Sequence, residues 1–303
     1  MADTPEGLYA KALQKLRTEF LPMQVGKTFT SEDVYRHFQL DRKSNAVDAK
    51  HAFGLVLYNL AKVNKKPELE QTGNKYRLID KAVDEVEWWK DDGELIECPL
   101  RLPLGLNDYC VLDTPCLIVV ASPTNQGKTA IMLNILNQNL ETYKDNIFLF
   151  ESDPIGQLKR RFKHLEFPIP IPPPFKVYRR LTNFEDVIVP TGLNLIDYVR
   201  VDVQKIWAIQ DTMLKILSKL TTGGIAVVGL QKPPGRDLAY GKDFSAFDSN
   251  LYLSIDKNKI RFVKIKTPKQ IEGVDPYKIA IEFKIRYGVQ LYDIHTVSID
   301  REE

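Results

Sequence analysis

Cysteine and histidine are scarce in this 303-residue chain, which holds three of the first and four of the second. The cysteines show no metal-ligand spacing and are too few for a disulfide framework, so we expect free thiols in a reducing cytoplasm. The histidines form no recognisable site. The residues concerned are Cys98, Cys110, Cys116, His37, His51, His164 and His295.

Long apolar runs and a strong net charge are also absent. No apolar run approaches the length needed to cross a bilayer, so we expect no membrane partner. The N-terminal sequence MADTPEGLYA has no basic region followed by an apolar stretch, so we expect no secretory signal. The net charge of +2 is close to neutral, and the chain as a whole does not indicate a polyanion partner.

The composition that remains is typical of a soluble globular protein. Hydrophobic residues make up 44% and charged residues 27%, which leaves room for a sizeable core and for two domains. The charge is unevenly distributed: residues 81–100 carry two Lys or Arg against seven Asp or Glu. Residues 256–269 carry six basic residues and one acidic one, so local basic patches are expected.

The acidic stretch 83–97 indicates a connector between two domains. We predict a small first domain over 1–82, an acidic linker over 83–99 and an α/β domain over 100–303. Trp88 and Trp89 lie in the linker, where packing against a domain is favoured over an exposed docking patch.

The first domain reads as three helices followed by a hairpin. Apolar residues recur at helical spacing over 8–20, and Thr30-Ser-Glu-Asp33 is typical of a capping box that opens a short second helix. Residues 69–79 read as two short strands around a Gly73-Asn74 turn. A third helix is predicted over 46–63, with an apolar side made of Val47, Phe53, Val56, Leu57 and Leu60.

This order of elements resembles a winged helix-turn-helix. The third helix would be the recognition helix and the hairpin the wing, so duplex DNA is the favoured partner. A winged helix used only for protein contacts is the alternative. The side chains suited to phosphates and base edges are Lys50 and Lys62 on the helix and Lys75 and Arg77 on the wing, with Arg42, Lys43, His51 and Asn59 nearby.

Apolar strand-like runs alternate with helical patterns from about residue 100 onward. Their continuous apolar character indicates strands buried on both faces, as in a parallel sheet. Helices are predicted over 128–143 and 203–220, and the Pro-rich stretches 167–175 and 232–237 are loops. We predict an α/β fold with antiparallel strands added near the C-terminus. The strand-like runs are 116–121, 146–151, 193–197, 225–231, 251–255, 260–265 and 277–285.

The strongest motif is ASPTNQGKTA, residues 121–130, which follows an apolar strand and opens a helix. A phosphate-binding loop requires that context, because backbone N–H groups and the helix dipole then point at the phosphates. Lys128 would reach the β- and γ-phosphates of ATP, and the Thr129 hydroxyl would hold Mg²⁺. Ser122 replaces the usual first glycine. The residues predicted to bind ATP are Ser122, Pro123, Thr124, Asn125, Gln126, Gly127, Lys128, Thr129 and Ala130.

Three further polar residues each close a strand-like run. Glu151 would position and deprotonate the attacking water, with Asp153 as a competing candidate. Asp197 resembles a Walker B carboxylate, which holds Mg²⁺ through water. Gln231 would sense the γ-phosphate through its amide. A solvated residue at a strand end is the alternative for each, and the prediction depends on their occurrence in order.

At this point the sequence resembles the RecA superfamily, and within it the core of the DnaB-type helicases. The resemblance covers roughly residues 100–290. It implies a RecA-like P-loop NTPase core, an ATPase that assembles into a ring or filament with ATP between neighbours. The segments that carry it are TNQGKT (124–129), FLFES (148–152), LIDYVRVD (195–202), VVGLQKPPGRD (227–237) and the lead-in 102–121.

The resemblance also implies residues that act beyond the subunit's own site. Lys264 and Lys266 lie where such helicases have a Lys and an Arg that reach the neighbouring subunit's ATP; a basic sheet edge that resists aggregation is the alternative. Single-stranded DNA would contact the loop 232–244, through Lys232, Arg236 and Lys242 beside Tyr240. A flexible flap over the active site is the other interpretation of this loop.

The function predicted from sequence is a DNA-dependent ATPase that acts as an oligomer on nucleic acid, as a helicase or translocase does. The N-terminal domain differs from that of the DnaB-type helicases, so a replicative role is not implied. An ATP-gated binding protein with little hydrolysis is the second hypothesis, and Lys266 in place of Arg favours it. A degenerate core that serves only as a scaffold is disfavoured by the intact Lys128, Thr129, Asp197 and Gln231.

Overall fold

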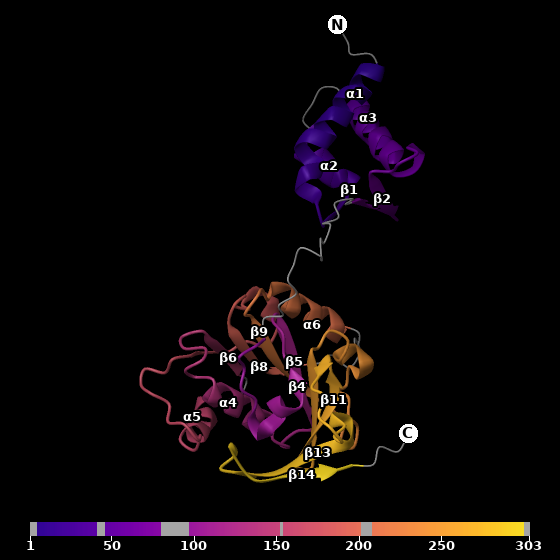
Figure 1. The fold of residues 1–303 in the computed structure, drawn as a ribbon. Coiled ribbons are helices and arrows are strands. Elements are labelled where there is room, and N and C mark those ends of the chain that lie inside the picture. The colour runs from indigo at the N-terminus through magenta and orange to yellow at the C-terminus, as the bar shows by residue number, and fades with distance from the viewer. Residues whose placement is uncertain (1–4, 41–45, 80–96, 152–153, 201–207, 300–303) are drawn as a thin grey trace. The chain divides into compact units, whose positions relative to one another are not determined.

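The computed structural model describes residues 5–40, 46–79, 97–151, 154–200 and 208–299. The chain forms two compact units, Met1–Asp91 and Asp92–Glu303 (Figure 1). Trp88, Trp89 and nearly all of the predicted acidic linker lie outside the described residues, as do Arg42, Lys43 and Asp153. None of the described helices is long and apolar enough to cross a membrane.

The N-terminal unit combines three helices with a three-stranded antiparallel sheet of order β1-β3-β2. Short π and 3-10 turns extend α1 to Gln24 and α3 to Val63. The helices and the hairpin predicted from sequence are confirmed. The elements are α1 (Pro5–Lys15), β1 (Thr28–Thr30), α2 (Ser31–His37), α3 (Ala46–Tyr58), β2 (Leu69–Thr72) and β3 (Lys75–Leu78).

Two features of this unit differ from the sequence prediction. Strand β1 escapes prediction because three residues give no periodic signal; its pairing with β3 and the burial of Phe29 define it. Val47 is 81% exposed although the helical pattern places it on the apolar side of α3. It lies in the first turn of α3, and the core of the unit closes only further along the helix, over Phe53, Val56, Leu57 and Leu60.

The predicted capping box at the start of α2 is present. The Asp33 N–H donates to the Thr30 hydroxyl oxygen at 3.3 Å, and the Thr30 N–H donates to the Asp33 carboxylate at 2.8 Å. The Thr30 hydroxyl also donates to that carboxylate, at 2.7 Å. The hydroxyl and then the backbone N–H of Thr30 lower the pKa of Asp33. The box therefore satisfies N–H groups that the first turn of a helix leaves unpaired.

The C-terminal unit is built on a nine-stranded sheet of order β14-β13-β11-β10-β5-β9-β8-β6-β7. The six strands from β10 to β7 run parallel, and β11, β13 and β14 continue the sheet in antiparallel fashion. The predicted α/β fold with a mostly parallel sheet is confirmed. The parallel strands are β5 (Cys116–Ser122), β6 (Ile147–Glu151), β7 (Lys176–Tyr178), β8 (Leu193–Val199), β9 (Ile225–Gln231) and β10 (Leu251–Asp256).

The remaining elements flank this sheet. Strand β4 (Cys110–Val111) pairs with β12 (Thr267–Pro268) in a separate two-stranded ladder. The antiparallel strands of the large sheet are β11 (Lys259–Ile265), β13 (Ile279–Arg286) and β14 (Gln290–Ser298), and the helices are α4 (Lys128–Gln138), α5 (Ile155–Phe162) and α6 (Ala208–Lys219). Single turns of 3-10 helix occupy 103–108, 184–186, 242–245 and 276–278.

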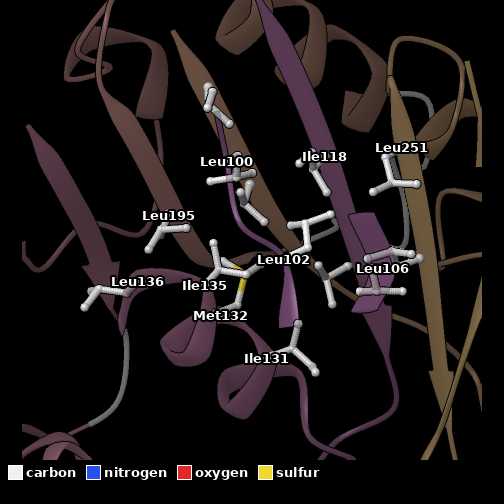
Figure 2. Packing of buried hydrophobic residues seen from close by; sticks show 14 of the residues in the cluster. Leu100, Leu102, Leu106, Ile118, Ile131, Met132, Ile135, Leu136, Leu195 and Leu251 are labelled. Carbon is white, nitrogen blue, oxygen red and sulfur yellow. The ribbon is translucent and has the colours of Figure 1, made fainter. Parts of the chain in front are cut away.

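Both faces of the parallel strands are buried. Alternate residues of β5 enter two different cores: Ile118 packs with the cluster that includes α4, and Val119 packs with the cluster that includes α6. Figure 2 shows Ile118, Leu195 and Leu251 from three strands gathered with Ile131 and Met132 of α4. Covered faces explain why the strands read as continuous apolar runs.

Some elements of this unit escape prediction. Helix α4 ends at Gln138, short of the predicted 143, and α5 and β7 lie in a segment whose prolines and charges mask their pattern. Strand β14 is an edge strand with mostly exposed residues, so it lacks the apolar signal of the central strands. The predicted helix 203–220 is described from Ala208 onward.

The three cysteines are free thiols buried in the C-terminal unit, as predicted. Burial raises the pKa of Cys110 to about 11 and that of Cys116 well above its usual value. A thiol with so high a pKa stays protonated at neutral pH and packs as a small apolar group.

Replacing Thr30 by Ala should destabilise α2 locally, because the capping box is lost at a cost of about 1 kcal/mol. Amide hydrogen exchange in residues 31–38, measured by mass spectrometry on the full chain, should become roughly fivefold faster. Thr30→Ser keeps a hydroxyl and serves as the control. Unchanged exchange in Thr30→Ala would mean that tertiary packing alone holds the helix.

Candidate functional site

The polar residues singled out in the sequence meet at one edge of the sheet. Strands β5, β9, β8 and β6 are parallel neighbours, so their carboxyl ends share that edge. The register pairs Ser122 with Gln231 and Glu151 with Asp197. Four residues that are far apart in the sequence therefore stand at the ends of four adjacent strands. Such an edge is where open α/β sheets bind ligands.

The loop between β5 and α4 has the geometry of an anion cradle. Gly127 precedes α4 with a φ of 103°, a left-handed conformation that favours glycine. A Cβ at Gly127 would also lie 2.6 Å from the Cδ1 of Ile285 on β13. Helix α4 begins at Lys128, so the N–H groups of its first turn face the loop. The start of an eleven-residue helix in this position suits a phosphate.

Ser122 occupies the place of the motif's usual first glycine without strain. It is the last residue of β5, it is fully buried, and it pairs in register with Gln231. Its hydroxyl donates to the Pro123 carbonyl at 2.7 Å. A position that continues an extended strand does not need glycine, which explains why the motif departs here from the usual pattern.

Two side-chain hydrogen bonds hold the loop between neighbouring elements. The Gln231 amide donates to the Thr124 hydroxyl at 2.5 Å, which joins the loop to the end of β9. The Gln126 side-chain oxygen accepts from the Lys257 N–H at 3.1 Å, which joins the loop to the turn between β10 and β11. The loop conformation is thus fixed from both sides.

Lys128 and Asp197 form an ion pair at the centre of the edge. The Asp197 side chain is 2% exposed and that of Lys128 is 14% exposed. The Lys128 ammonium also lies over the ring of Tyr198, 4.5 Å from its centroid. Glycine is required beside this pair: a Cβ at Gly229 on β9 would lie 2.9 Å from the Cδ of Lys128 and 3.2 Å from the Oδ1 of Asp197.

These groups line a cavity of about 510 Å³. The cavity brings together eight of the nine predicted ATP-binding residues, all except Gln126, with Glu151, Asp197 and Gln231. Glu151 is 3% exposed, so its carboxylate is largely shielded from bulk water. A donor-rich loop, a lysine and three strand-end polar groups around one cavity can bind the phosphates of a nucleotide.

The residues also fit a phosphate-bound Mg²⁺. Thr129 and Asp197 both line the cavity, and hydroxyl and carboxylate oxygens are the ligands that Mg²⁺ prefers. Among the described residues, no group of three His, Cys, Asp or Glu side chains is placed to hold a metal by itself.

Four cavity residues escaped the sequence reasoning: Arg161, Asn258, Ile285 and Gly288, whereas Tyr198 lies in the segment LIDYVRVD that carries the family resemblance. Arg161 belongs to α5, whereas Ile285 and Gly288 come from β13 and the turn that follows it. The basic run KRR at 159–161 is the one signal that could have indicated Arg161. The hairpin residues give no sequence signal, because only the antiparallel extension of the sheet brings them over the loop.

The lysines predicted to reach a neighbouring subunit lie away from this cavity. Lys264 pairs in register with Tyr252 near the start of β10, whereas the end of β10 lies at the phosphate-loop edge. The Lys264 ammonium donates to the carbonyls of Ala246 at 2.8 Å and Phe247 at 2.7 Å. Burial lowers the pKa of Lys264. Lys266 is exposed, and neither lysine lines the cavity of its own chain.

The loop that follows β9 presents only part of the predicted nucleic-acid set. Arg236 and Lys242 are exposed, and Tyr240 is 42% exposed. Lys232 is instead buried, with its ammonium 3.2 Å from the Asp256 carboxylate and bonded to the Arg236 carbonyl. Lys232 follows β9 directly, and its buried side chain fixes the loop. It is therefore not exposed for the contact with single-stranded DNA that the sequence predicted.

Asp256 completes this internal anchor. Burial acts to raise its pKa, but the Gly235 N–H, which donates at 2.5 Å, and the Lys232 ammonium lower it overall. The carboxylate therefore stays ionised and holds residues 232–235 against the end of β10.

In the N-terminal unit, the predicted basic residues lie on α3, the turn after it and the hairpin. Lys62 and Lys75 are exposed. Lys50 is half-buried and lies over the ring of Tyr35 at 5.3 Å, and Arg77 pairs across the hairpin with Glu70 at 2.5 Å. Part of the positive charge of the hairpin is thus neutralised within the unit.

Comparison with known proteins assigns neither a family nor a function to this chain. No family model and no curated protein matches the sequence. Among solved structures, the chain is similar to a KaiC-like protein from the hyperthermophilic archaeon Pyrococcus horikoshii OT3, with 13% sequence identity and a TM-score of 0.42. The similarity covers 60% of this chain and 91% of that one. At this level it adds nothing to the strand order and loop geometry described above.

Replacing Gly229 by Ala should weaken ATP binding by about tenfold or more, because the added methyl group displaces Lys128 and disturbs Asp197. Titration with a fluorescent ATP analogue would measure the change. Gly156→Ala on α5 is a matched control, since a Cβ there meets nothing within 4 Å. Equal affinity in Gly229→Ala and the native chain would show that Lys128 does not bind the nucleotide from this position.

Proposed function

We propose that the C-terminal unit is a RecA-type ATPase core that binds and hydrolyses ATP as part of an assembly of several copies acting on nucleic acid. The observation that carries the proposal is the meeting of the phosphate loop, Glu151, Asp197 and Gln231 around one cavity at the carboxyl ends of four adjacent parallel strands. Glu151 and Asp197 are 3% and 2% exposed, which argues against the alternative of solvated residues at strand ends.

The strand order supports the RecA-type interpretation. Strand β9 lies between the loop-bearing β5 and the Asp197-bearing β8, and β6 with Glu151 lies beyond β8. Two strands thus separate the loop from Glu151, and both line the same cavity. Gln231, at the end of the inserted strand, stands between the two.

In the proposed reaction, Glu151 orients a water molecule and accepts its proton as the water oxygen attacks the γ-phosphorus. The bond from the γ-phosphorus to the bridging oxygen breaks, and ADP and inorganic phosphate leave. Lys128 and the N–H groups at the start of α4 stabilise the charge on the phosphate oxygens. Thr129 and Asp197 would hold Mg²⁺, which neutralises phosphate charge when bound.

The position of Lys264 and Lys266 supports an oligomer. Both lie away from the cavity of their own chain, so they reach ATP only if a neighbouring copy presents its own cavity to them. A ring or a filament with ATP between copies meets that requirement. Arg236, Lys242 and Tyr240, on the loop after Gln231, would contact single-stranded DNA and couple its binding to the nucleotide.

The N-terminal unit is proposed to be a winged helix. Three helices, a strand between the first two, and a terminal hairpin in one antiparallel sheet support this interpretation. Helix α3 with Lys50, the turn after it with Lys62, and the hairpin with Lys75 and Arg77 would contact duplex DNA or a protein partner.

A second candidate function is an ATP-gated switch that binds nucleic acid or protein with little hydrolysis. The observation that favours it is the engagement of Lys264 by two carbonyls of its own chain, since a lysine held in this way is less available to a neighbouring active site.

ATP hydrolysis by the purified chain should depend on Lys128 and should rise with single-stranded DNA. Lys128→Ala is expected to lower turnover on the order of 100-fold, because one cation at the transferred phosphate is lost. Lys144→Ala, at an exposed site outside the cavity, is the control. ATP binding without turnover in the native chain would support the switch. If the native chain neither binds nor hydrolyses ATP, both proposals are overturned.

Replacing Glu151 by Gln should lower turnover by roughly 100- to 10,000-fold and leave ATP affinity close to that of the native chain, since the amide cannot accept a proton. Single-turnover hydrolysis and equilibrium binding measure the two effects separately. Unchanged turnover would assign the base to another residue.

A further inference from the structure

The segment between β6 and β8 carries a concentration of positive charge that the proposed function does not use. Residues 155–183 contain seven Lys or Arg and one acidic residue, although the whole chain has a net charge of only +2. Figure 1 shows this segment, which begins with α5 and ends after β7, projecting from the side of the sheet. The charge is therefore local and lies at one edge of the C-terminal unit.

The segment is a folded part of the unit. Leu158 of α5 is buried, and the rings of Phe162 and Phe175 pack edge to face at 5.6 Å, which joins α5 to the start of β7. The Asn137 side chain of α4 donates to the Phe167 carbonyl at 2.7 Å and accepts from the Phe167 N–H at 2.9 Å. The prolines between these anchors restrict the backbone further.

Four basic side chains of this segment lack the ion pairs that basic residues form elsewhere in the described part of the unit. Lys259, Lys284 and Arg261 each pair with a carboxylate, at 2.6, 2.7 and 2.6 Å. By contrast, Lys159, Arg160, Lys163 and Arg179 are exposed, and none of them forms an ion pair with a carboxylate among the residues described. A solvated charged face usually mixes both signs, so a surface of one sign indicates an anionic partner.

Arg180, which follows β7, is held by contacts with residues 182–186. Arg180 donates to the carbonyls of Thr182 at 2.8 Å and Asn183 at 2.7 Å and pairs with Asp186 at 2.9 Å. Arg179 and Arg180 line a second cavity together with Pro154 and Glu151. The two arginines that follow β7 thus border a hollow that also touches Pro154, the residue before α5, and the proposed catalytic carboxylate of Glu151.

Exposed aromatic rings lie among these charges. Tyr178 is 45% exposed and its ring stacks against Phe150 at 5.9 Å, and Phe167 is 47% exposed. Aromatic rings stack on the bases of a single strand, which a duplex keeps in its interior. The segment therefore combines basic side chains for phosphates with rings for unpaired bases.

We infer that the surface formed by α5 and β7, with Lys159, Arg160, Lys163 and Arg179 as its phosphate contacts, is a second binding site for single-stranded nucleic acid. This site goes beyond the proposed function, because it is separate from the loop 232–244 and requires no bound ATP. It adjoins the cavity through Glu151, so a strand bound there lies next to the site of hydrolysis.

The test is the affinity of the full chain for a fluorescent oligothymidylate of about 20 nucleotides, measured by anisotropy without ATP over a range of salt concentrations. In the combined variant Lys159→Ala, Arg160→Ala and Arg179→Ala, affinity should fall by about tenfold or more, and the slope of log K against log salt should decrease by about 2. Lys144→Ala, Lys219→Ala and Lys278→Ala remove the same charge from exposed sites elsewhere and should change neither property by more than about twofold. Circular dichroism checks that both variants fold.

Two results of these measurements would overturn the inference. One is equal weakening in the two triple variants, which would mean that only total charge matters. The other is binding to vesicles rich in phosphatidylserine but not to the oligonucleotide, which would point to a membrane surface and to Ile171, 96% exposed in the Pro-rich loop.

A parallel variant, Arg236→Ala with Lys242→Ala, separates this inference from the proposed function. If that change alone removes oligonucleotide binding, the α5–β7 surface is not a binding site and the proposed loop stands. If only the α5–β7 variant loses binding, the loop assignment falls and the inference holds. The ATP hydrolysis that depends on Lys128 is measured without nucleic acid, so its result does not depend on either nucleic-acid site.

Discussion

The burial of both faces of the parallel sheet is the constraint on which the rest of the C-terminal unit depends. Side chains along β5, β8 and β9 enter apolar cores on either face. A buried polar side chain among them requires its own hydrogen bonds, as Asn194 near the start of β8 has with the carbonyls of Val189, Gly192 and Ile225. Polar chemistry is therefore confined to strand ends. Parallel neighbours bring those ends to one edge, where Lys128 and Asp197 meet. The position of the site follows from the packing of the core.

The same burial explains how much could be predicted from sequence. The continuous apolar runs identified all the central strands, and the polar residue at the end of each run located Glu151, Asp197 and Gln231. The phosphate loop was recognised from its order between a strand and a helix. The lateral order of the strands could not be predicted, because it depends on which helices cover which face and not on the strands' own composition.

The sequence could not predict the roles of residues that depend on contacts with distant elements. Gly229 resembles any small strand residue until the path of the Lys128 side chain is known. Lys232 carries a charge and sits in a Pro-rich loop, and only the position of Asp256 at the end of a neighbouring strand explains its burial. In the N-terminal unit, Arg77 gave the signal of a ligand-binding residue but pairs with Glu70 across the hairpin. A charged residue in a sequence indicates that it forms an ion pair or a ligand contact, but the sequence does not show which group is the partner.

The buried pair of Lys232 and Asp256 sets a limit on motion near the site. Its two side chains are 0% and 14% exposed, and separating such a pair without a new partner costs on the order of 3–5 kcal/mol. The beginning of the loop after β9 is thus clamped to the end of β10, and Arg261 holds Asp237 two residues further along from Gly235. The segment that follows is held as well: the Ala239 N–H donates to the Tyr252 hydroxyl, and Lys264 donates to the carbonyls of Ala246 and Phe247. The exposed rings of Tyr240, Phe244 and Phe247 are thus presented from a fixed backbone beside the cavity, so a ligand that contacts them meets a preformed surface.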